Sequence, residues 1–195
     1  MAGEIAAPVR GAAGLPVTGG GGPVSWADGL VERTADASLA AMRVPLRILD
    51  VGCGAGALLR EMVIRVPYGE EYVGVEFDPE AIARARRAGD PRLRFRLASP
   101  ASLPFDDASF DLVVATAGAD RWPDQAAGVS ELARVVADAG RVVLVERSTR
   151  SGSGARRPRA VGELLDGAGL RLERCETLAR VAFTVPTVRA YVAAP

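Results

Sequence analysis

The sequence contains no lysine, no asparagine and no histidine, so all 24 of its basic residues are arginine. Arginine stays protonated at physiological pH and therefore cannot serve as a general base. Any proton transfer falls to carboxylates, tyrosine, cysteine or water instead. The chain thus lacks histidine and lysine, two of the side chains that acid–base enzymes use.

Cysteine is scarce, and long apolar runs are absent. The two cysteines, Cys53 and Cys175, are too few and too far apart to indicate a disulfide scaffold or a zinc site, and we expect no metal. We interpret Cys53 as a small filler in a turn and Cys175 as a core strand residue. No apolar run approaches about 18 residues, and no apolar segment follows a basic start. We therefore expect neither a transmembrane span nor a signal peptide, and a cytoplasmic location.

The sequence has no excess of positive or negative charge, because its 24 acidic residues offset the 24 arginines. A protein without net charge is a poor candidate for general binding to nucleic acid or to a membrane surface. We therefore expect neither partner. With 195 residues, of which 49% are hydrophobic, the chain fits one globular domain. Residues 1–24 are rich in Ala, Gly and Pro, which predicts a flexible arm before a single domain over 25–195.

Strand and helix patterns alternate along this domain. An amphipathic helix is predicted from Ser25 onward, and further helices over 56–65, 79–89, 124–137 and 160–170. Strands are predicted over 46–51, 72–76, 93–98, 110–116 and 141–146. An alternation of strand and helix predicts parallel strands joined by crossover connections, with helices on both faces of the sheet.

Two last strands, over 170–177 and 181–193, follow one another without a helix between them. A parallel return needs a dozen or more residues, so these strands must be antiparallel. The sequence therefore predicts an α/β, Rossmann-like, doubly wound and mostly parallel sheet of seven strands that ends in an antiparallel hairpin.

A glycine-rich turn, "DVGCGAG" from Asp50 to Gly56, follows the first strand of this alternation. Glycines let a backbone approach a ligand closely, and Glu76, at the end of the second strand, can accept hydrogen bonds from ribose hydroxyls. The spacing also satisfies the looser dinucleotide fingerprint, so two ligand classes remain open on the glycines alone. Asp50 would repel a pyrophosphate, whereas it would tolerate an amino acid ammonium or a sulfonium.

Four ordered stretches between about Arg47 and Glu146 carry a resemblance: "LDVGCGAG", "YVGVEFDPEAIARAR", "LPFDDASFDLVVA" and "ELARVVADAGRVVLVE". They resemble the class I S-adenosylmethionine-dependent methyltransferases of small molecules, which include quinone-biosynthesis enzymes. The resemblance implies S-adenosyl-L-methionine as cofactor, with Glu76 on its ribose and Phe77 on its adenine. It implies that the residues around the methionine part are Asp50, Gly52, Cys53, Gly54 and Gly56. Asp78 would help to close this loop, or would cap the helix that begins at Pro79.

Two positions depart from the family pattern where chemistry is expected. Ser99 stands where an aspartate usually accepts a hydrogen bond from the adenine amino group, and its hydroxyl or a backbone carbonyl would substitute. Arg121, in "DRWPD", stands where the family often has a histidine. Asp120 is a candidate base and Arg121 a candidate anchor for an acidic substrate. Alternatively, this stretch is a loop and a helix start, with Trp122 packed on the sheet.

The favoured hypothesis is methyl transfer from S-adenosylmethionine to a small-molecule acceptor, achieved mainly by proximity and orientation. A second hypothesis is a catalytically silent module that binds S-adenosylmethionine or S-adenosylhomocysteine. A third, disfavoured by Asp50, is an NAD(P)-dependent oxidoreductase. The expected partner is the small-molecule acceptor, and a homodimer is compatible with the resemblance.

Overall fold

The structure is a computed structural model, and it describes residues 29–41, 47–87, 89–116, 122–148, 161–179 and 187–195. The predicted arm over 1–24 lies outside these residues. The described helices are α1 (Leu30–Leu39), α2 (Ala57–Arg65), α3 (Pro79–Arg87), α4 (Gln125–Val135) and α5 (Val161–Gly167). The described strands are β1 (Arg47–Val51), β2 (Glu71–Glu76), β3 (Leu93–Leu97), β4 (Phe110–Thr116), β5 (Val136–Ser148), β6 (Arg171–Ala179) and β7 (Thr187–Ala194).

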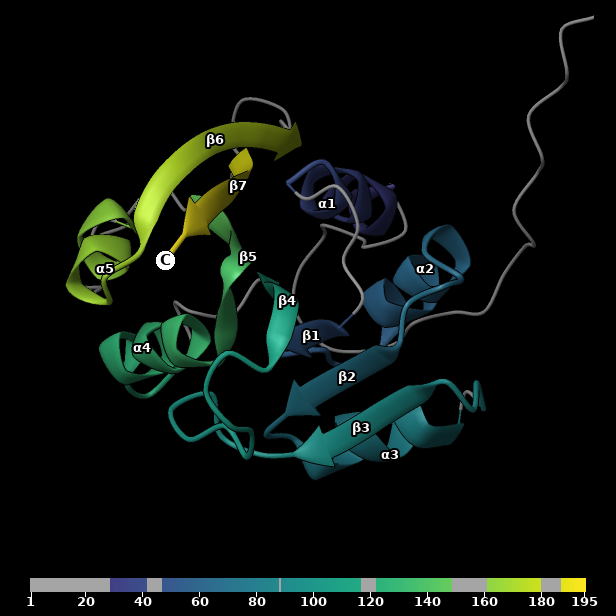
Figure 1. The fold of residues 1–195 in the computed structure, drawn as a ribbon. Coiled ribbons are helices and arrows are strands. Elements are labelled where there is room, and N and C mark those ends of the chain that lie inside the picture. The colour runs from purple at the N-terminus through teal and green to yellow at the C-terminus, as the bar shows by residue number, and fades with distance from the viewer. Residues whose placement is uncertain (1–28, 42–46, 88, 117–121, 149–160, 180–186) are drawn as a thin grey trace, which may run out of the picture.

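In the described part of the chain the strands form one seven-stranded sheet in the order β3-β2-β1-β4-β5-β7-β6 (Figure 1). The first five strands of this order are parallel to one another, whereas β7 runs antiparallel to both β5 and β6. The predicted doubly wound sheet with its closing antiparallel hairpin is confirmed. The order of the strands reverses between β1 and β4, which is where a sheet of this kind opens a crevice for a ligand.

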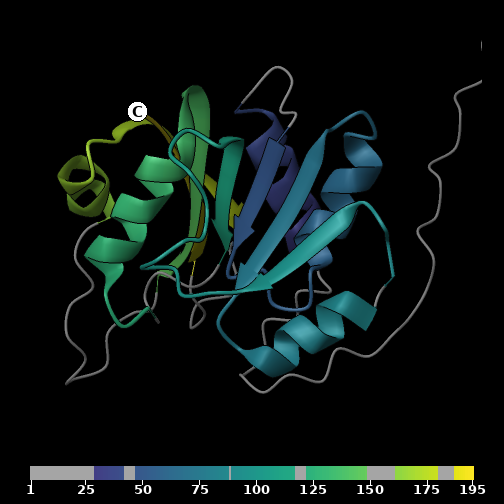
Figure 2. The ribbon, with the colours of Figure 1, turned by 60° about the horizontal axis from the view of Figure 1, so that its bottom comes forward.

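Helices cover both faces of the sheet, as predicted. The helices α1 and α2 pack on one face in a core cluster with Ile48 of β1, and α4 and α5 pack on the other face in a cluster with Leu49. Figure 2 shows α4 (green) and α2 (blue) on opposite sides of the strands. Right-handed crossovers place α3 on the same face as α2, because β1, β2 and β3 follow one another in one direction. None of the helices in the described ranges is long and apolar enough to cross a membrane.

One connection interrupts the alternation of strand and helix, and no helix was predicted there. Between β3 and β4 the chain crosses over in turns, and residues 98–109, all of them described, contain no helix. Pro100 and Pro104 account for this, because proline has no N–H to donate and clashes with a preceding helical turn. Leu103 of this loop is buried in the same core cluster as α4.

Two details differ from the sequence prediction. The helix predicted over 124–137 ends at Val135, and the next strand already begins at Val136, which is extended (φ −75°, ψ 137°) and pairs with Phe110. Adjacent β-branched valines favour this earlier change from helix to strand. The interpretation of Cys175 as a core residue is wrong: its side chain is exposed, because β6 is the edge strand of the sheet.

Candidate functional site

The glycine turn leaves the carboxyl end of β1 and is tied to the neighbouring strand. The backbone N–H groups of Gly52 and Cys53 both donate to the carbonyl oxygen of Val75, at 2.8 and 3.0 Å. Gly52 (φ 79°) and Gly56 (φ 80°) have left-handed backbone conformations, which side chains with a Cβ rarely adopt. Hydrogen bonds to β2 therefore hold the turn, and glycine at positions 52 and 56 permits the left-handed backbone that it adopts.

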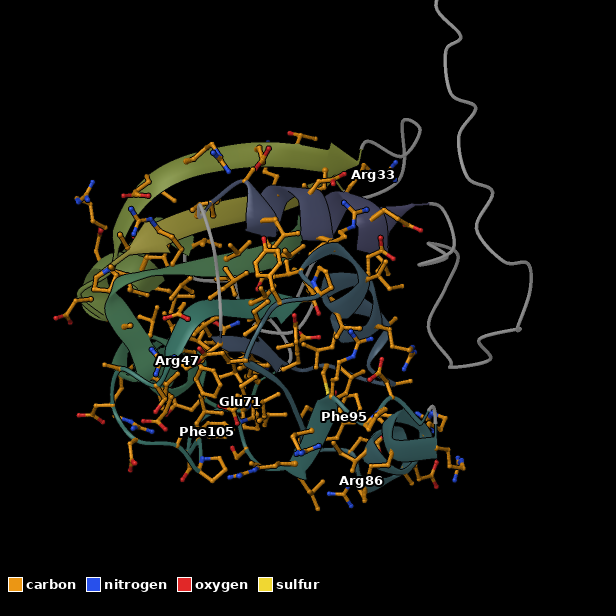
Figure 3. The ribbon with its side chains drawn as sticks, turned by 45° about the vertical axis from the view of Figure 1, so that its right-hand side comes forward. Arg33, Arg47, Glu71, Arg86, Phe95 and Phe105 are labelled. Carbon is orange, nitrogen blue, oxygen red and sulfur yellow. The ribbon has the colours of Figure 1, made fainter. Side chains whose placement is uncertain are left out.

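The glycines of this turn have different surroundings. A Cβ on Gly56 would lie 2.6 Å from the ring of Phe95, which is labelled in Figure 3, so this glycine allows close packing on β3. A Cβ on Gly54 would meet no atom within 4 Å. The open side of the turn is thus at Gly54, where a ligand can approach the backbone. Arg60, which the sequence interpretation missed, donates to the carbonyl oxygen of Ala55 at 2.8 Å and stiffens the turn from α2.

Glu76, at the end of β2, holds together the glycine turn after β1 and the loop after β2. Its Oε2 accepts from the N–H of Gly54 at 3.1 Å, and its Oε1 accepts from the N–H groups of Phe77 and Asp78 at 2.8 and 3.2 Å. A carboxylate has about four acceptor sites, so capacity for a further donor remains. Glu76 therefore connects the glycine turn to the loop after β2, a role beyond the predicted one on ribose. Asp78 accepts from Glu80 N–H at 2.9 Å, as a helix cap does.

Asp50 is the most unusual ionisable group of the site. It is 1% exposed, and neither of its carboxylate oxygens has a hydrogen-bond partner among the described residues. Burial raises the pKa of this carboxyl to about 8, with a further contribution from the negative charge of Glu76. A buried carboxylate without a donor is costly, so a ligand that brings a cation or several donors would stabilise it.

Cys53 lies inside the turn with its side chain buried. Its sulfur is 2.7 Å from the place where a Cβ on Gly74 would lie, so the thiol fills the space that this glycine leaves. Burial raises the pKa of the thiol, and the charges of Asp50 and Glu76 raise it further. A thiol that resists ionisation is a poor nucleophile. The interpretation of Cys53 as a filler is confirmed.

Two exposed apolar side chains lie at the carboxyl ends of β2 and β3. Phe77 and Leu97 are each 55% exposed, and Leu97 pairs with Glu76 across the sheet. Sequence reasoning identified Phe77 but missed Leu97, since the alternation of β3 predicts that Leu97 points inward like Leu93. Ser99 follows two residues later; its side chain is also exposed, and its Oγ accepts from the N–H of Ala101 at 3.2 Å.

The residues predicted for chemistry after β4 are only partly within the structure. Asp120 and Arg121 lie outside the described residues. Trp122 is 5% exposed, and a Cβ on Gly128 would come within 2.3 Å of its ring, so it packs directly on α4. Asp124 caps α4 by accepting from the N–H of Ala127 at 2.9 Å. The interpretation as a helix start is thus confirmed for Asp124, whereas the ring of Trp122 contacts α4, within the core cluster that also contains sheet residues.

Two hollows, of about 290 and 500 Å³, lie away from the glycine turn. The smaller is lined by Arg47, Glu71 and neighbouring charged residues at the amino ends of β1, β2 and β3, and the larger by Glu71, Arg96 and residues of the loop from 103 to 110. Figure 3 shows Arg47, Glu71 and Phe105 on this side of the sheet. No predicted site residue lines either hollow. Ligands of open α/β sheets bind at the carboxyl ends of the strands, which favours the glycine turn as the site.

The residues at the carboxyl ends of β1, β2 and β3 fit a particular kind of ligand. Asp50, buried and without a hydrogen-bond partner among the described residues, suits a ligand that brings a cation, whereas a pyrophosphate brings only negative charge. The space beside Gly54 admits a group close to the backbone, and Phe77 offers an exposed ring for a flat base. Among the described residues no group of three His, Cys, Asp or Glu could hold a metal ion. This arrangement suits a nucleoside that carries an amino acid.

Comparison with known proteins agrees with this geometry. Residues 49–144 match the methyltransferase domain family. The chain is 40% identical over 111 residues to a demethylmenaquinone methyltransferase of Thermus thermophilus, covering 55% of this chain and 50% of that protein. It is 32% identical over 123 residues to a tocopherol O-methyltransferase of Arabidopsis thaliana, covering 57% of this chain and 34% of that protein. The chain thus spans about half the length, or less, of these curated relatives.

Solved structures share the fold at lower sequence identity. A SAM-dependent methyltransferase from Aquifex aeolicus superimposes with a TM-score of 0.68 at 17% identity, covering 85% of this chain and 92% of that one. An S-adenosylmethionine-dependent methyltransferase from Mesorhizobium loti gives a TM-score of 0.66 at 19% identity, covering 85% and 100%. At these identities the likeness concerns the fold alone.

Proposed function

We propose that this chain, whose residues 49–144 match the methyltransferase domain family, is a class I S-adenosylmethionine-dependent methyltransferase that transfers a methyl group from S-adenosyl-L-methionine to a small-molecule acceptor. The observation that carries the proposal is Asp50, a buried carboxylate without a partner among the described residues, beside an open glycine turn. S-adenosylmethionine has both an ammonium and a sulfonium, and either cation would relieve the isolation of this carboxylate.

The chain's own residues would hold the cofactor along the carboxyl edge of the sheet. We assign Asp50 and the turn from Gly52 to Gly56 to its amino acid part, Glu76 to its ribose, and Phe77 and Ser99 to its base. When bound, the cofactor supplies a methyl group on a sulfonium, which a nucleophile can displace in line. Holding the acceptor in that line removes translational and rotational freedom in advance, which is worth about 7–11 kcal/mol at best.

The acceptor we propose is a phenol or hydroquinone ring. The relatives that support this choice are a demethylmenaquinone methyltransferase and a tocopherol O-methyltransferase, both matched over half of this chain. A chain without histidine or lysine needs an acceptor that loses its proton readily, and a phenolic hydroxyl does so. Asp120 is the base and Arg121 the anchor for an acidic group on the acceptor in this proposal.

The alternative is a module that binds the cofactor without transferring its methyl group, favoured by Ser99 and Arg121 in place of the usual aspartate and histidine. Incubating the full chain with methyl-labelled S-adenosylmethionine and a panel of hydroquinones, naphthohydroquinones and catechols separates the two. We expect labelled product and an equal amount of S-adenosylhomocysteine. Cofactor binding without label in any acceptor would favour the silent module, and absence of cofactor binding would reject both.

A further inference from the structure

In the proposed complex, Ser99 lies at the outer edge of the cofactor's purine base. The N–H of Ala98 donates to the carbonyl oxygen of Glu76 at 3.1 Å, so Ser99 begins just beyond the carboxyl end of β2. If the amino acid part lies over β1 and the ribose over β2, the base lies toward the end of β3. This placement rests on the proposed function, and it makes Ser99 a polar side chain available to the edge of the purine.

The turn that contains Ser99 leaves few hydrogen-bond donors for a ligand. The N–H of Ala101 donates to Ser99 Oγ at 3.2 Å, and the N–H of Ser102 donates to the Ser99 carbonyl oxygen at 3.1 Å. Pro100 between them has no N–H. The backbone donors from 100 to 102 are therefore absent or used within the turn. What remains on the side chain of Ser99, besides a lone pair, is the hydroxyl hydrogen.

A hydroxyl that already accepts from the backbone is best placed to donate outward. Adenine has an acceptor at N1 and a donor in its 6-amino group, whereas hypoxanthine has a donor at N1–H and an acceptor in its 6-oxo group. A donating hydroxyl can serve either base, whereas a carboxylate at the same place can only accept and would be repelled by a 6-oxo group. We propose that Ser99 makes the site tolerant of the group at position 6 of the purine, so that it binds S-inosylhomocysteine nearly as well as S-adenosylhomocysteine.

The substitution Ser99→Asp tests this proposal by changing the polarity of the position without removing the turn. An aspartate side chain can also accept from the N–H of residue 101, and position 99 is exposed, so the variant keeps its fold. Isothermal titration of the full chain compares S-adenosylhomocysteine with S-inosylhomocysteine. In the unsubstituted protein we expect dissociation constants within about threefold of each other, and in Ser99→Asp about a tenfold or larger preference for the adenosyl ligand.

Two further variants complete the test. Ser99→Ala should weaken both ligands by a similar factor, about threefold to tenfold, because each loses the same donor. Ser102→Ala, which removes another exposed hydroxyl from the same turn, should leave both constants unchanged. A preference of the unsubstituted protein for the adenosyl ligand by thirtyfold or more, or an unchanged ratio in Ser99→Asp, would overturn the proposal. If S-adenosylhomocysteine itself fails to bind, the proposed function fails, and this inference falls with it.

Discussion

Asp50, which we assign to the amino acid part of the proposed cofactor, makes the stability of the ligand-free protein depend on pH. Its carboxyl pKa of about 8, against an ordinary value of 3.8, means that the folded protein holds a proton there which the unfolded chain has already released. Between about pH 4 and pH 8 the folded state therefore binds more protons, and the free energy of unfolding falls as the pH rises. Asp50 therefore destabilises the ligand-free protein most at the upper end of this pH range.

Asp50→Asn should remove this dependence, because an amide does not titrate. We expect the stability of the ligand-free variant relative to the unsubstituted protein to increase between pH 5 and pH 8 by on the order of 3 kcal/mol. Urea denaturation at both pH values measures the difference, and Asp166→Asn, an exposed carboxyl on α5, is the control. Equal pH dependence in Asp50→Asn and the unsubstituted protein would contradict this account of Asp50.

Glu76 joins two loops through three backbone N–H groups, and a glutamine cannot satisfy all of them. Its amide nitrogen would face a donor, so Glu76→Gln should lower the free energy of unfolding by about 1–3 kcal/mol. The same change should raise the dissociation constant for S-adenosylhomocysteine at least about tenfold, by loosening the turn and weakening the acceptor for ribose. Glu71→Gln, at the exposed opposite end of β2, should change neither quantity, and unchanged binding in Glu76→Gln would refute the ribose assignment.

At the scale of an element, the connection between β3 and β4 contains no helix, and side chains of α4 hold it in place by hydrogen bonds. The guanidinium of Arg134 on α4 donates to the carbonyl oxygens of Leu103 and Phe105 and to the carboxylate of Asp107, at 3.1, 2.8 and 2.8 Å. Glu131, one turn earlier, accepts from Arg134 and from the N–H of Leu103 at 2.7 Å. This pair fixes the loop whose earlier part contains Ser99.

Arg134→Gln should release that loop while leaving the sheet intact. We expect the free energy of unfolding to fall by about 2 kcal/mol and amide hydrogen exchange over 98–109 to accelerate, because a glutamine cannot contact both carbonyl groups and both carboxylates. Arg141→Gln, which breaks the Arg141–Glu173 ion pair on the sheet, serves as control and should leave exchange in the loop unchanged. Slow exchange over 98–109 in Arg134→Gln would contradict a fixing role for this residue.

For the whole molecule, the sequence predicted the topology because its signals are local and repeated. The parallel strands are apolar runs separated by helix patterns, and the short link before the last strand allows only an antiparallel return. No helix was predicted over 98–109 and none is found there, whereas the early start of β5 at Val136 was not predicted. Both depend on individual residues, Pro100 and Val136, whose effect is decided by what the segment pairs or packs with.

The positions of candidate site residues could be predicted where they lie at strand ends. Their hydrogen-bond partners could not, because these depend on how neighbouring segments line up. Asp50 and Glu76 follow from their places at the ends of neighbouring strands. The contacts of Glu76 with Gly54, and those of Arg60 with the turn, depend on which backbone groups lie opposite, which no spacing in the sequence encodes. The exposure of Leu97 likewise differs from that of Leu93, which is buried on the same strand, and no alternation in the sequence predicts that difference. The predictions for Asp120 and Arg121 stay predictions.

The central claim is that the carboxyl edge of β1 and β2 binds an amino acid-bearing nucleoside rather than a dinucleotide. Isothermal titration of the full chain with S-adenosylmethionine, S-adenosylhomocysteine, NADH and NADPH tests it directly. The account predicts micromolar binding of the first two ligands, whose cations favour the ionised form of Asp50, and none of the nicotinamide cofactors, whose pyrophosphate brings only negative charge toward it. Binding of NADH or NADPH, or failure of both S-adenosyl ligands to bind, would contradict it.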